Sequence, residues 1–302
     1  MKKIITLLLV LLVITGCSKN ETIDSTVDIE ETVISVVTPS GAPTLSLLEY
    51  ADNNNFDIDV VDGSEVLQAE FVKKEADMIV APINLGVKLS ESTGNYKLAA
   101  VLTWGNLYLV SSKEDFNEGE VAAFGEASVP GKVIGYLNDE LKDYEFIWFG
   151  AVNEVSSAFL TGEYDAAIIA EPYLSMTKSK AKNTVYDIIN LQDLYSKKSG
   201  YESYPQSALF INTDAIEKKK DAINKYLIEL KDSIVLFNEK IDELIQKIDN
   251  VDMEKLGFAN PDLIKKAYTK MAIKFVKADE CQDQINDFLK LYGMEATNEI
   301  IY

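Results

Sequence analysis

The sequence predicts an α/β protein of two similar lobes, each a mixed β-sheet flanked by helices. Three observations support this prediction. Short aliphatic runs alternate with helical runs from Thr32 onward, the alternation restarts near Glu120, and two patterns of the first half recur in the second. With 302 residues, 47% hydrophobic and 26% charged, the chain can bury two cores of ordinary size.

The first half alternates strands with helices. The expected strands are nearly continuous aliphatic runs, at Thr32–Thr38, Phe56–Asp62, Asp77–Pro82 and Lys97–Trp104. Helices are expected between them, at Leu45–Asn53, Ser64–Lys74 and Asn84–Ser92. Strands of this composition are typical of a parallel or mixed sheet that helices cover on both faces.

The second half repeats this alternation and ends in helices. Strands are expected at Glu120–Gly125, Glu145–Gly150, Asp165–Pro172, Val185–Leu191 and Ser207–Thr213. Helices are expected at Pro130–Leu141, Asn153–Gly162 and Tyr173–Lys182. Three long C-terminal helices follow, at Asp214–Ile248, Pro261–Phe275 and Asp283–Tyr292.

Two internal echoes suggest how the lobes are connected. EADMIVAP (Glu75–Pro82) and EYDAAIIAEP (Glu163–Pro172) share Glu, Asp, an aliphatic strand, Ala and Pro. PSGAP follows the first strand of one half, and GEASVP follows the first strand of the other. We therefore expect a second lobe, residues 111–207, inserted into a first lobe made of residues 32–110 and 208–302.

The N-terminus has the features of a lipoprotein signal. Two lysines precede an apolar run from Ile4 to Ile14, which at ~1.5 Å per residue covers about half a hydrocarbon core. Ile14-Thr15-Gly16-Cys17 resembles the lipobox of bacterial lipoproteins, which implies a signal peptide over residues 1–16 and acylation (palmitate) of Cys17. Residues 17–31 are polar and acidic, so we expect a flexible tether. An ordinary signal peptide with an incidental cysteine is the alternative.

Composition argues against several functions. The net charge is −20, and all the cationic side chains are lysines, so nucleic-acid binding is not expected. Histidine is absent, which removes the commonest general base and zinc ligand. Cys17 and Cys281 are too few for a cysteine metal cluster, and Cys281 is expected to be a buried apolar residue. No metal or cofactor is expected.

Two loops of small residues are candidate ligand contacts. In open α/β sheets, ligands bind beyond the carboxyl ends of strands, where helix starts carry unpaired N–H groups and about half a positive charge. Ser40-Gly41-Ala42 and Ala127-Ser128 stand at equivalent places of the two halves. We interpret them as facing anchor points that let a ligand approach the backbone, with simple helix capping as the alternative for each loop.

Other candidate contacts follow other strand ends: Pro82, Ile83, Asn84, Trp104, Asn106, Asn153, Glu171, Tyr204 and Gln206. Each has an alternative interpretation. Trp104 stacks on a ring or belongs to the core, and Asn153 contacts a ligand or caps its helix. Glu171 accepts from a ligand amine or faces water. Tyr204 and Gln206 line the hinge side, or Tyr204 is a surface aromatic residue.

Several of these segments together resemble a known family. The lipobox, PSGAP, TWGNLYLVSSK, VAAFGEASVP, LTGEYDAAIIAEP and YPQSALFINT, in this order, resemble type II periplasmic-binding proteins of ABC importers. The closest branch is the SsuA/THI5-like (NMT1-like) one, which handles nitrate, sulfonates, taurine and thiamine-precursor pyrimidines. The resemblance covers about Thr32 to Asn212, and its most specific element is LTGEYDAAIIAEP.

The resemblance implies a two-lobed periplasmic-binding-protein type II fold that closes on a solute. It assigns solute contacts to Ser40, Gly41 and Ala42, to Pro82, Ile83 and Asn84, and to Ala127, Ser128 and Glu171. Synthases on this fold depend on a histidine, which this chain lacks. Sulfonate and nitrate binders often add a cationic side chain, and none stands among these candidates. An uncharged heterocyclic solute therefore fits better, although an anion held by helix starts remains allowed.

We therefore expect a monomeric lipoprotein on the extracytoplasmic side of the cell membrane. It would capture a small solute such as a sulfonate, a nitrate-like anion or a thiamine-precursor-like heterocycle and deliver it to an ABC permease. An enzyme that uses Glu171 or Tyr204 as acid or base is one alternative. A surface protein without a small ligand is another.

Overall fold

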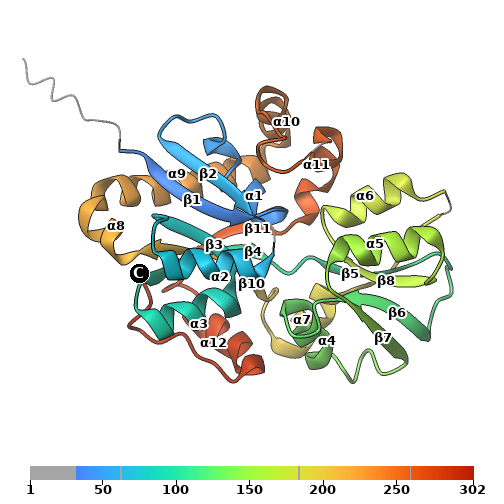
Figure 1. Cartoon of the computed structure of the whole chain (residues 1–302). Helices are drawn as coiled ribbons and strands as arrows, with labels where there is room; N and C mark the ends of the chain where they lie inside the picture. Colours follow the sequence, from blue (N-terminus) through green and yellow to red (C-terminus); the bar gives the residue numbers. More distant parts are fainter. Residues whose placement is uncertain (1–31, 62, 183, 259) are drawn as a thin grey trace, which may run out of the picture. The chain divides into compact units, whose positions relative to one another are not determined.

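The structure, a computed structural model, describes residues 32–61, 63–182, 184–258 and 260–302 (Figure 1). The expected signal peptide, Cys17 and the tether lie outside the described residues. Residues 32–302 form one unit that contains a six-stranded and a five-stranded sheet. No helix within the described ranges is both long and apolar enough to cross a lipid bilayer.

The six-stranded sheet has the order β11-β4-β10-β3-β1-β2. Its strands are β1 (Ile34–Pro39), β2 (Phe56–Val61), β3 (Met78–Pro82), β4 (Tyr96–Trp104), β10 (Pro205–Asn212) and β11 (Ile273–Lys277). Strand β1 runs parallel to β2 and β3, whereas β10 is antiparallel to β3 and β4, and β11 is antiparallel to β4. The sheet is therefore mixed, as predicted.

The five-stranded sheet has the order β7-β6-β8-β5-β9. Its strands are β5 (Leu107–Ser111), β6 (Gly119–Phe124), β7 (Tyr144–Phe149), β8 (Ala166–Ala170) and β9 (Tyr186–Asn190). Strand β6 is parallel to β7 and β8, and β5 is antiparallel to β8 and β9. The chain passes from one sheet to the other between β4 and β5 and returns between β9 and β10.

Helices cover both faces of both sheets, which explains why the central strands are aliphatic along their whole length. On the six-stranded sheet, α2 (Ser64–Lys73), α3 (Ile83–Thr93) and α12 (Gln282–Leu289) share one core, while α1 (Ala42–Leu45), α9 (Lys220–Glu239), α10 (Ile241–Asn250) and α11 (Pro261–Ala267) share the other. On the five-stranded sheet, α5 (Val152–Thr161) and α6 (Tyr173–Lys180) pack opposite α4 (Val129–Tyr136) and α7 (Leu191–Ser199). The predicted α/β architecture of two helix-flanked mixed sheets is confirmed.

The predicted helix Leu45–Asn53 is wrong. The chain instead forms the four-residue α1 and a 3₁₀ turn, η1 (Leu48–Tyr50). The Ser46 hydroxyl donates to the Pro43 carbonyl at 2.6 Å, and the Thr44 hydroxyl donates to the Pro39 carbonyl at 2.7 Å. Such local side-chain bonds compete with a regular helix. A helix of four residues aligns few peptide dipoles, so the partial positive charge expected at Ser40-Gly41-Ala42 is smaller than that of a full helix.

The C-terminal helices are shorter than predicted. Asp214–Ile248 divides into α8 (Thr213–Lys218), α9 and α10. Lys219 leaves the helical conformation, and its ammonium reaches the Asp77 carboxylate at 2.6 Å. The predicted helix Pro261–Phe275 ends early, in η2 (Tyr268–Lys270), and gives way to β11. Helix α12 continues into η3 (Lys290–Tyr292), as a 3₁₀ turn.

Three elements were not predicted: β5, α7 and β11. Strand β11, at the edge of the six-stranded sheet, buries Ile273 and Phe275 on one face, while Lys274 and Lys277 are exposed and Val276 is half-buried. The sequence predicts a helix through Phe275 instead, because the strand is short and contains two lysines. Its place beside β4 follows from pairing with residues about 170 positions earlier, which local sequence does not reveal.

Candidate functional site

Two chain segments connect the sheets, and they are bonded to each other. Trp104 at the end of β4 pairs with Pro205 at the start of β10. The Gly105 N–H donates to the Tyr204 carbonyl at 3.0 Å and contacts the Ser203 hydroxyl at 3.1 Å. A Cβ at Gly105 would lie 2.5 Å from the Tyr204 ring, so this close approach requires glycine. We call Trp104–Asn106 and Ser203–Gln206 the crossing segments.

Tyr204 is a structural residue of this crossing. Its ring is fully buried, and its hydroxyl donates to Gln192 Oε1 at 3.2 Å. The Leu107 N–H donates to the same oxygen at 2.8 Å. Burial raises the pKa of Tyr204 well above its ordinary value, so its proton is not available near neutral pH. Tyr204 is therefore not a surface aromatic residue, and Gln192, which holds it, was missed in the sequence.

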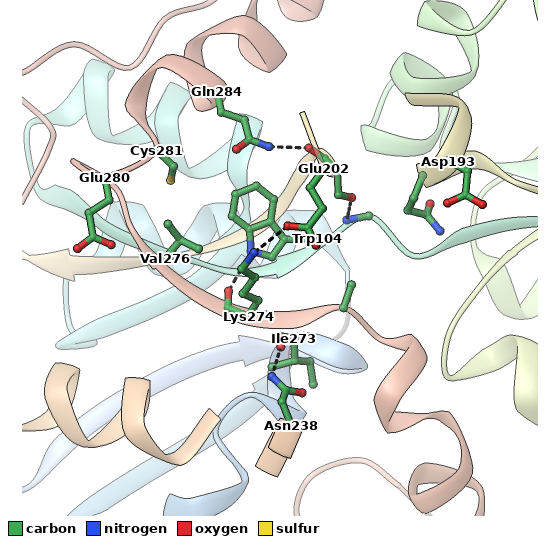
Figure 2. A pocket seen from close by; sticks show the side chains of 14 residues that line it. Trp104, Asp193, Glu202, Asn238, Ile273, Lys274, Val276, Glu280, Cys281 and Gln284 are labelled. Carbon is green, nitrogen blue, oxygen red and sulfur yellow. Dashed lines mark hydrogen bonds and ion pairs between the residues drawn. The ribbon is translucent and has the colours of Figure 1, made fainter. Parts of the chain in front are cut away.

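A groove of about 580 Å³ lies beside the crossing segments, and we call it the hinge groove (Figure 2). Trp104 lines it and is 7% exposed, and its indole N–H donates to the Lys274 carbonyl at 2.9 Å. Gln284 donates to the Ser203 carbonyl at 2.6 Å across the groove. The interpretation of Trp104 as a core residue is therefore confirmed, whereas its contact with a ligand stays a prediction.

A second, smaller cavity of about 90 Å³ joins elements of the two lobes. Ser40 and Gly41 line it together with Pro172, Tyr173 and Met176 from the start of α6. Residues of and before α11 complete the wall: Gly257, Phe258, Asn260, Leu263 and Ile264. We call it the loop cavity. Ala127 and Ser128 are not among its lining residues, so the second-lobe loop across from Ser40 and Gly41 is the one that opens α6.

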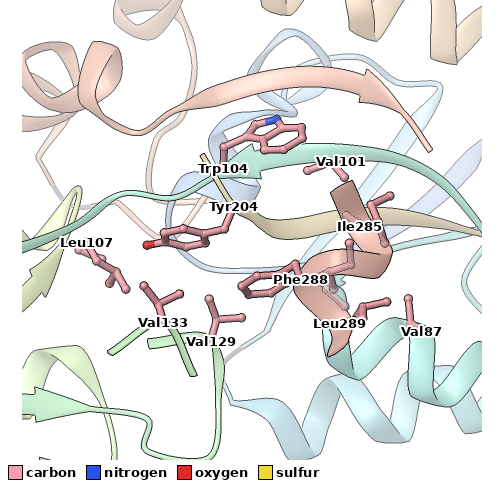
Figure 3. Packing of buried hydrophobic residues seen from close by; sticks show 14 of the residues in the cluster. Val87, Val101, Trp104, Leu107, Val129, Val133, Tyr204, Ile285, Phe288 and Leu289 are labelled. Atoms are coloured by element: carbon pink, nitrogen blue, oxygen red, sulfur yellow. The ribbon is translucent and has the colours of Figure 1, made fainter. Parts of the chain in front are cut away.

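Ser128 precedes α4, as expected, but its hydroxyl donates to the Gly125 carbonyl at 2.8 Å instead of capping the helix. The first turns of α4 are anchored by apolar contacts. Val129 and Val133 lie beside Tyr204 and Phe288, in a core that continues from one sheet to the other (Figure 3). The helix start is therefore held next to a crossing segment.

Asn153 is the second residue of α5, so the interpretation as a helix cap is wrong and Ala151 takes that position. The Glu154 carboxylate instead accepts from the Gly150 and Ala151 N–H groups, at 2.9 and 3.2 Å. Asn153 lines a cavity of about 260 Å³ with residues of α5 and α6. Tyr173 lines both this cavity and the loop cavity.

Glu171 ends the motif EYDAAIIAEP and is 3% exposed, so the interpretation that it faces water is wrong. Its carboxylate accepts from the Ser175 N–H and from the Ser175 hydroxyl, both at 3.0 Å. Burial raises the pKa of Glu171 and outweighs these two hydrogen bonds. Its backbone carbonyl accepts from Asn106 Nδ2 at 3.2 Å, which connects β8 to a crossing segment.

Three predicted contact residues carry buried amide oxygens that have no hydrogen-bond partner among the described residues: Asn84, Asn106 and Gln206. We call them the amide cluster. The other unpartnered side-chain atoms of this kind in the described ranges are hydroxyl oxygens of Ser90, Tyr50, Tyr226, Tyr268 and Tyr292. Pro82 and Ile83 lead into Asn84 at the start of α3. Ala42 is buried within α1.

Among the described residues, no group of three or more Cys, Asp or Glu side chains is placed to hold a metal ion. Cys281 is 9% exposed, and burial raises the pKa of its thiol to about 12. The expectation that Cys281 is a buried apolar residue is confirmed.

Solved structures share this fold, whereas no family model and no curated protein sequence matches the chain. An ABC transporter protein from Parabacteroides distasonis has a TM-score of 0.76 and 24% identity, over 90% of this chain and 99% of that one. The aliphatic sulphonate binding protein SsuA from Escherichia coli has a TM-score of 0.64 and 11% identity, over 89% and 92%. A zinc-bound ligand-binding component of an ABC-type import system from Staphylococcus aureus has a TM-score of 0.63 and 12% identity, over 90% of this chain and 96% of that one. The predicted periplasmic-binding-protein fold is therefore confirmed.

Proposed function

We propose that the protein is an extracytoplasmic solute-binding lipoprotein of an ABC importer, which binds a small organic solute between its two lobes. The fold supports this proposal, since the similar structures include components of such importers. Fold alone does not determine function, so the argument rests on the site.

The observation that carries the proposal is the amide cluster. Buried polar side chains in native proteins nearly always have partners, and an unpartnered one costs about 1–3 kcal/mol. Three such oxygens belong to residues just past the carboxyl ends of β3 and β4 and at the start of β10, and ligands of open α/β sheets bind beyond strand ends of this kind. A bound solute would supply the missing donors and recover that cost.

Solute entry requires the two lobes to move apart. Pockets for small organic molecules usually enclose about 300–1,000 Å³, whereas the loop cavity encloses about 90 Å³. Ser40 and Gly41 lie on one wall of this cavity and Pro172, Tyr173 and Met176 on another, so separating these elements would enlarge it. We infer a hinge at the crossing segments, with solute binding shifting the balance between open and closed forms.

Anchoring and partners follow from the N-terminal sequence and the proposed role. We propose that the signal peptide is cleaved before Cys17, that Cys17 is acylated, and that residues 18–31 tether a monomer to the outer face of the cell membrane. Two or more acyl chains would give stable attachment, because one chain alone binds membranes marginally. The solute would be passed to a membrane permease.

The contacts at the site favour binding over catalysis. Tyr204 has no exposed surface, and its hydroxyl is bonded to Gln192. The Glu171 carboxylate is held by both donors of Ser175. A general acid or base must reach a substrate proton within hydrogen-bond distance, and neither group is placed to do so.

Native mass spectrometry of the purified protein, combined with thermal shift against sulfonates, pyrimidines, amino acids and purines, tests the proposal. A copurified small molecule, or stabilisation by about 2.7 kcal/mol at 100 times the dissociation constant, is the expected result. Turnover of the bound compound would support the enzyme alternative. No bound compound and no stabilisation by any member would support a surface protein without a small ligand.

A further inference from the structure

We infer that the solute presents N–H donors, as an amide, an amidine or an amino-substituted heterocycle does, and that it has no anionic group facing the amide cluster. This inference rests on the proposed function and narrows it to a solute class. It follows from three properties of the cluster: the position of its residues in the strand register, the orientation of the Asn106 amide, and the local charge.

Strand register brings the cluster residues to one edge of the six-stranded sheet. Asn84 follows Pro82, the last residue of β3, and Pro82 pairs with Ser207 of β10. Asn106 lies two residues after Trp104, which pairs with Pro205 of β10. Gln206 stands between these two paired positions, so it lies between the ends of β3 and β4.

Gln206 also occupies a β-bulge. Pro205 pairs with Trp104 and Ser207 pairs with Thr103, so two steps on β10 match one step on β4. Gln206 is the additional residue. Bulges redirect a side chain and are frequent next to functional sites. A β-bulge can form with other side chains, so the bulge does not explain why this position carries a glutamine with an unpartnered oxygen. A hydrogen-bond donor on the solute explains it.

The orientation of the Asn106 amide is determined by its neighbour. Asn106 Nδ2 donates to the Glu171 backbone carbonyl at 3.2 Å. A rotated amide would direct an oxygen at that carbonyl oxygen, which repels it. Oδ1 is therefore the atom left without a partner, and Asn106 is 1% exposed. A carbonyl oxygen only accepts hydrogen bonds, so its missing partner must be a donor.

The charges nearby disfavour an anion. The Glu171 carboxylate lies next to the carbonyl that Asn106 contacts, and the lysines that act on it are Lys178 and Lys270. Lys178 is paired with Asp187 at 2.5 Å. Carbonyl oxygens and a carboxylate present negative potential to a solute, whereas sulfonates and nitrate require donors. A neutral or cationic solute with two or more N–H groups matches these acceptors.

A matched series of aromatic probes tests the charge and donor requirement. Thermal shift and calorimetry on the purified protein would use benzamidine and benzamide as donors, and benzoate and benzenesulfonate as anions of similar size. Stabilisation by the donor probes alone is the expected result. Stabilisation by the anions alone would overturn the inference while leaving solute binding intact. If no probe binds and no small molecule copurifies, both the inference and the proposed function fail.

The substitution Gln206→Met separates a ligand contact from a structural role. It keeps the side-chain length and removes the unpartnered oxygen. We expect about tenfold weaker benzamidine binding, as for one lost hydrogen bond, and an unchanged or raised melting temperature of the free protein. Gln246→Met, at an exposed position of α10, is the matched control and should leave both quantities unchanged. A lowered melting temperature with unchanged affinity would contradict the inference.

A second variant, Gln206→Glu, separates the loss of the oxygen from a steric effect of the methionine side chain in Gln206→Met. Gln206→Glu retains an acceptor and adds a negative charge. It should preserve or strengthen binding of cationic benzamidine and should not create benzenesulfonate binding. Loss of benzamidine binding in Gln206→Glu as well as in Gln206→Met would show that the glutamine NH₂ group, not its oxygen, contacts the solute, and would overturn the inference.

Discussion

The side-chain amide of Asn106 donates to the backbone carbonyl of Glu171 at 3.2 Å, and both residues are almost fully buried. Asn106 belongs to a crossing segment that leaves the six-stranded sheet, and Glu171 directly follows β8 of the five-stranded sheet. This bond therefore connects the place where the lobes join to the turn that opens α6. The same turn, through Pro172 and Tyr173, forms one wall of the loop cavity. One hydrogen bond therefore separates a wall of the loop cavity from a crossing segment.

Glu171 should make stability depend on pH. Burial raises the folded-state pKa of Glu171 above the ordinary glutamate value of 4.5. The folded protein therefore binds a proton more tightly than the unfolded chain does, and this contribution, fully present below about pH 4.5, is lost as the pH rises through the raised value. Glu171→Gln should flatten this part of the profile of unfolding free energy, measured by urea denaturation. The exposed Glu163→Gln is the control, and an equal flattening by both would contradict the assignment.

Two glycines of the α4 region should respond in opposite directions. A Cβ at Gly131 would lie 1.9 Å from the Glu126 carbonyl oxygen, so Gly131→Ala must displace the backbone before α4 and should cost about 1–3 kcal/mol. Gly135, one turn later, has open space around the same position. Gly135→Ala should stabilise by about 0.5–1 kcal/mol through helix propensity. Chemical denaturation of both variants measures the difference, and equal effects would show that the loop before α4 adjusts freely.

Gly41→Val should weaken solute binding more than it weakens the fold. Gly41 lines the loop cavity and has φ 108° and ψ −153°, a region that residues with a Cβ rarely adopt. The strain is expected to cost about 1–3 kcal/mol, and the side chain would enter the cavity. Gly200→Val is the control, since Gly200 also has positive φ (81°) but ends α7 away from the cavity. Equal affinities for the copurified solute in both variants would remove Gly41 from the site.

Ser128→Lys tests whether the start of α4 contacts the solute. Ser128→Ala should cost about 0.5–1.5 kcal/mol through loss of the bond to the Gly125 carbonyl. Ser128→Lys adds a cation at a helix start, where the helix dipole disfavours it by a further ~0.3–1 kcal/mol. We expect loss of solute binding in Ser128→Lys and retention in Ser128→Ala, by calorimetry. Unchanged affinity in both would exclude this loop from the site.

Cys17→Ser should release the protein from the membrane. The proposed acyl chains are attached at Cys17, so the substitution removes the proposed anchor. We expect the variant in the soluble or secreted fraction, and mass spectrometry of the wild-type protein should find an acylated N-terminal cysteine. Cys281→Ser, at a buried position, is the control and should leave the distribution between fractions unchanged. Membrane retention of Cys17→Ser would contradict the lipid anchor.

Much of the site was predicted from local sequence, because strand ends are visible as the points where aliphatic runs stop. Strand ends predict Asn84, Asn106 and Gln206 as contact residues, and these three carry the unpartnered amide oxygens. Gln192 was missed, because its importance comes from accepting two hydrogen bonds from Tyr204 and Leu107. Internal similarity predicts that Ser128 faces Ser40. In the structure, Tyr173 lines the loop cavity together with Ser40, and Ser128 is not among the lining residues.

The sequence by itself determined the alternation of strands and helices, the mixed sheets and the absence of histidine chemistry. These follow from hydrophobic periodicity and composition, which act over a few residues at a time. The tertiary structure alone decided that β11 joins β4, that α1 stops after four residues, and that α6 lies across from Ser40. These outcomes depend on contacts between residues far apart in the chain, whose energies appear only when both partners are in place.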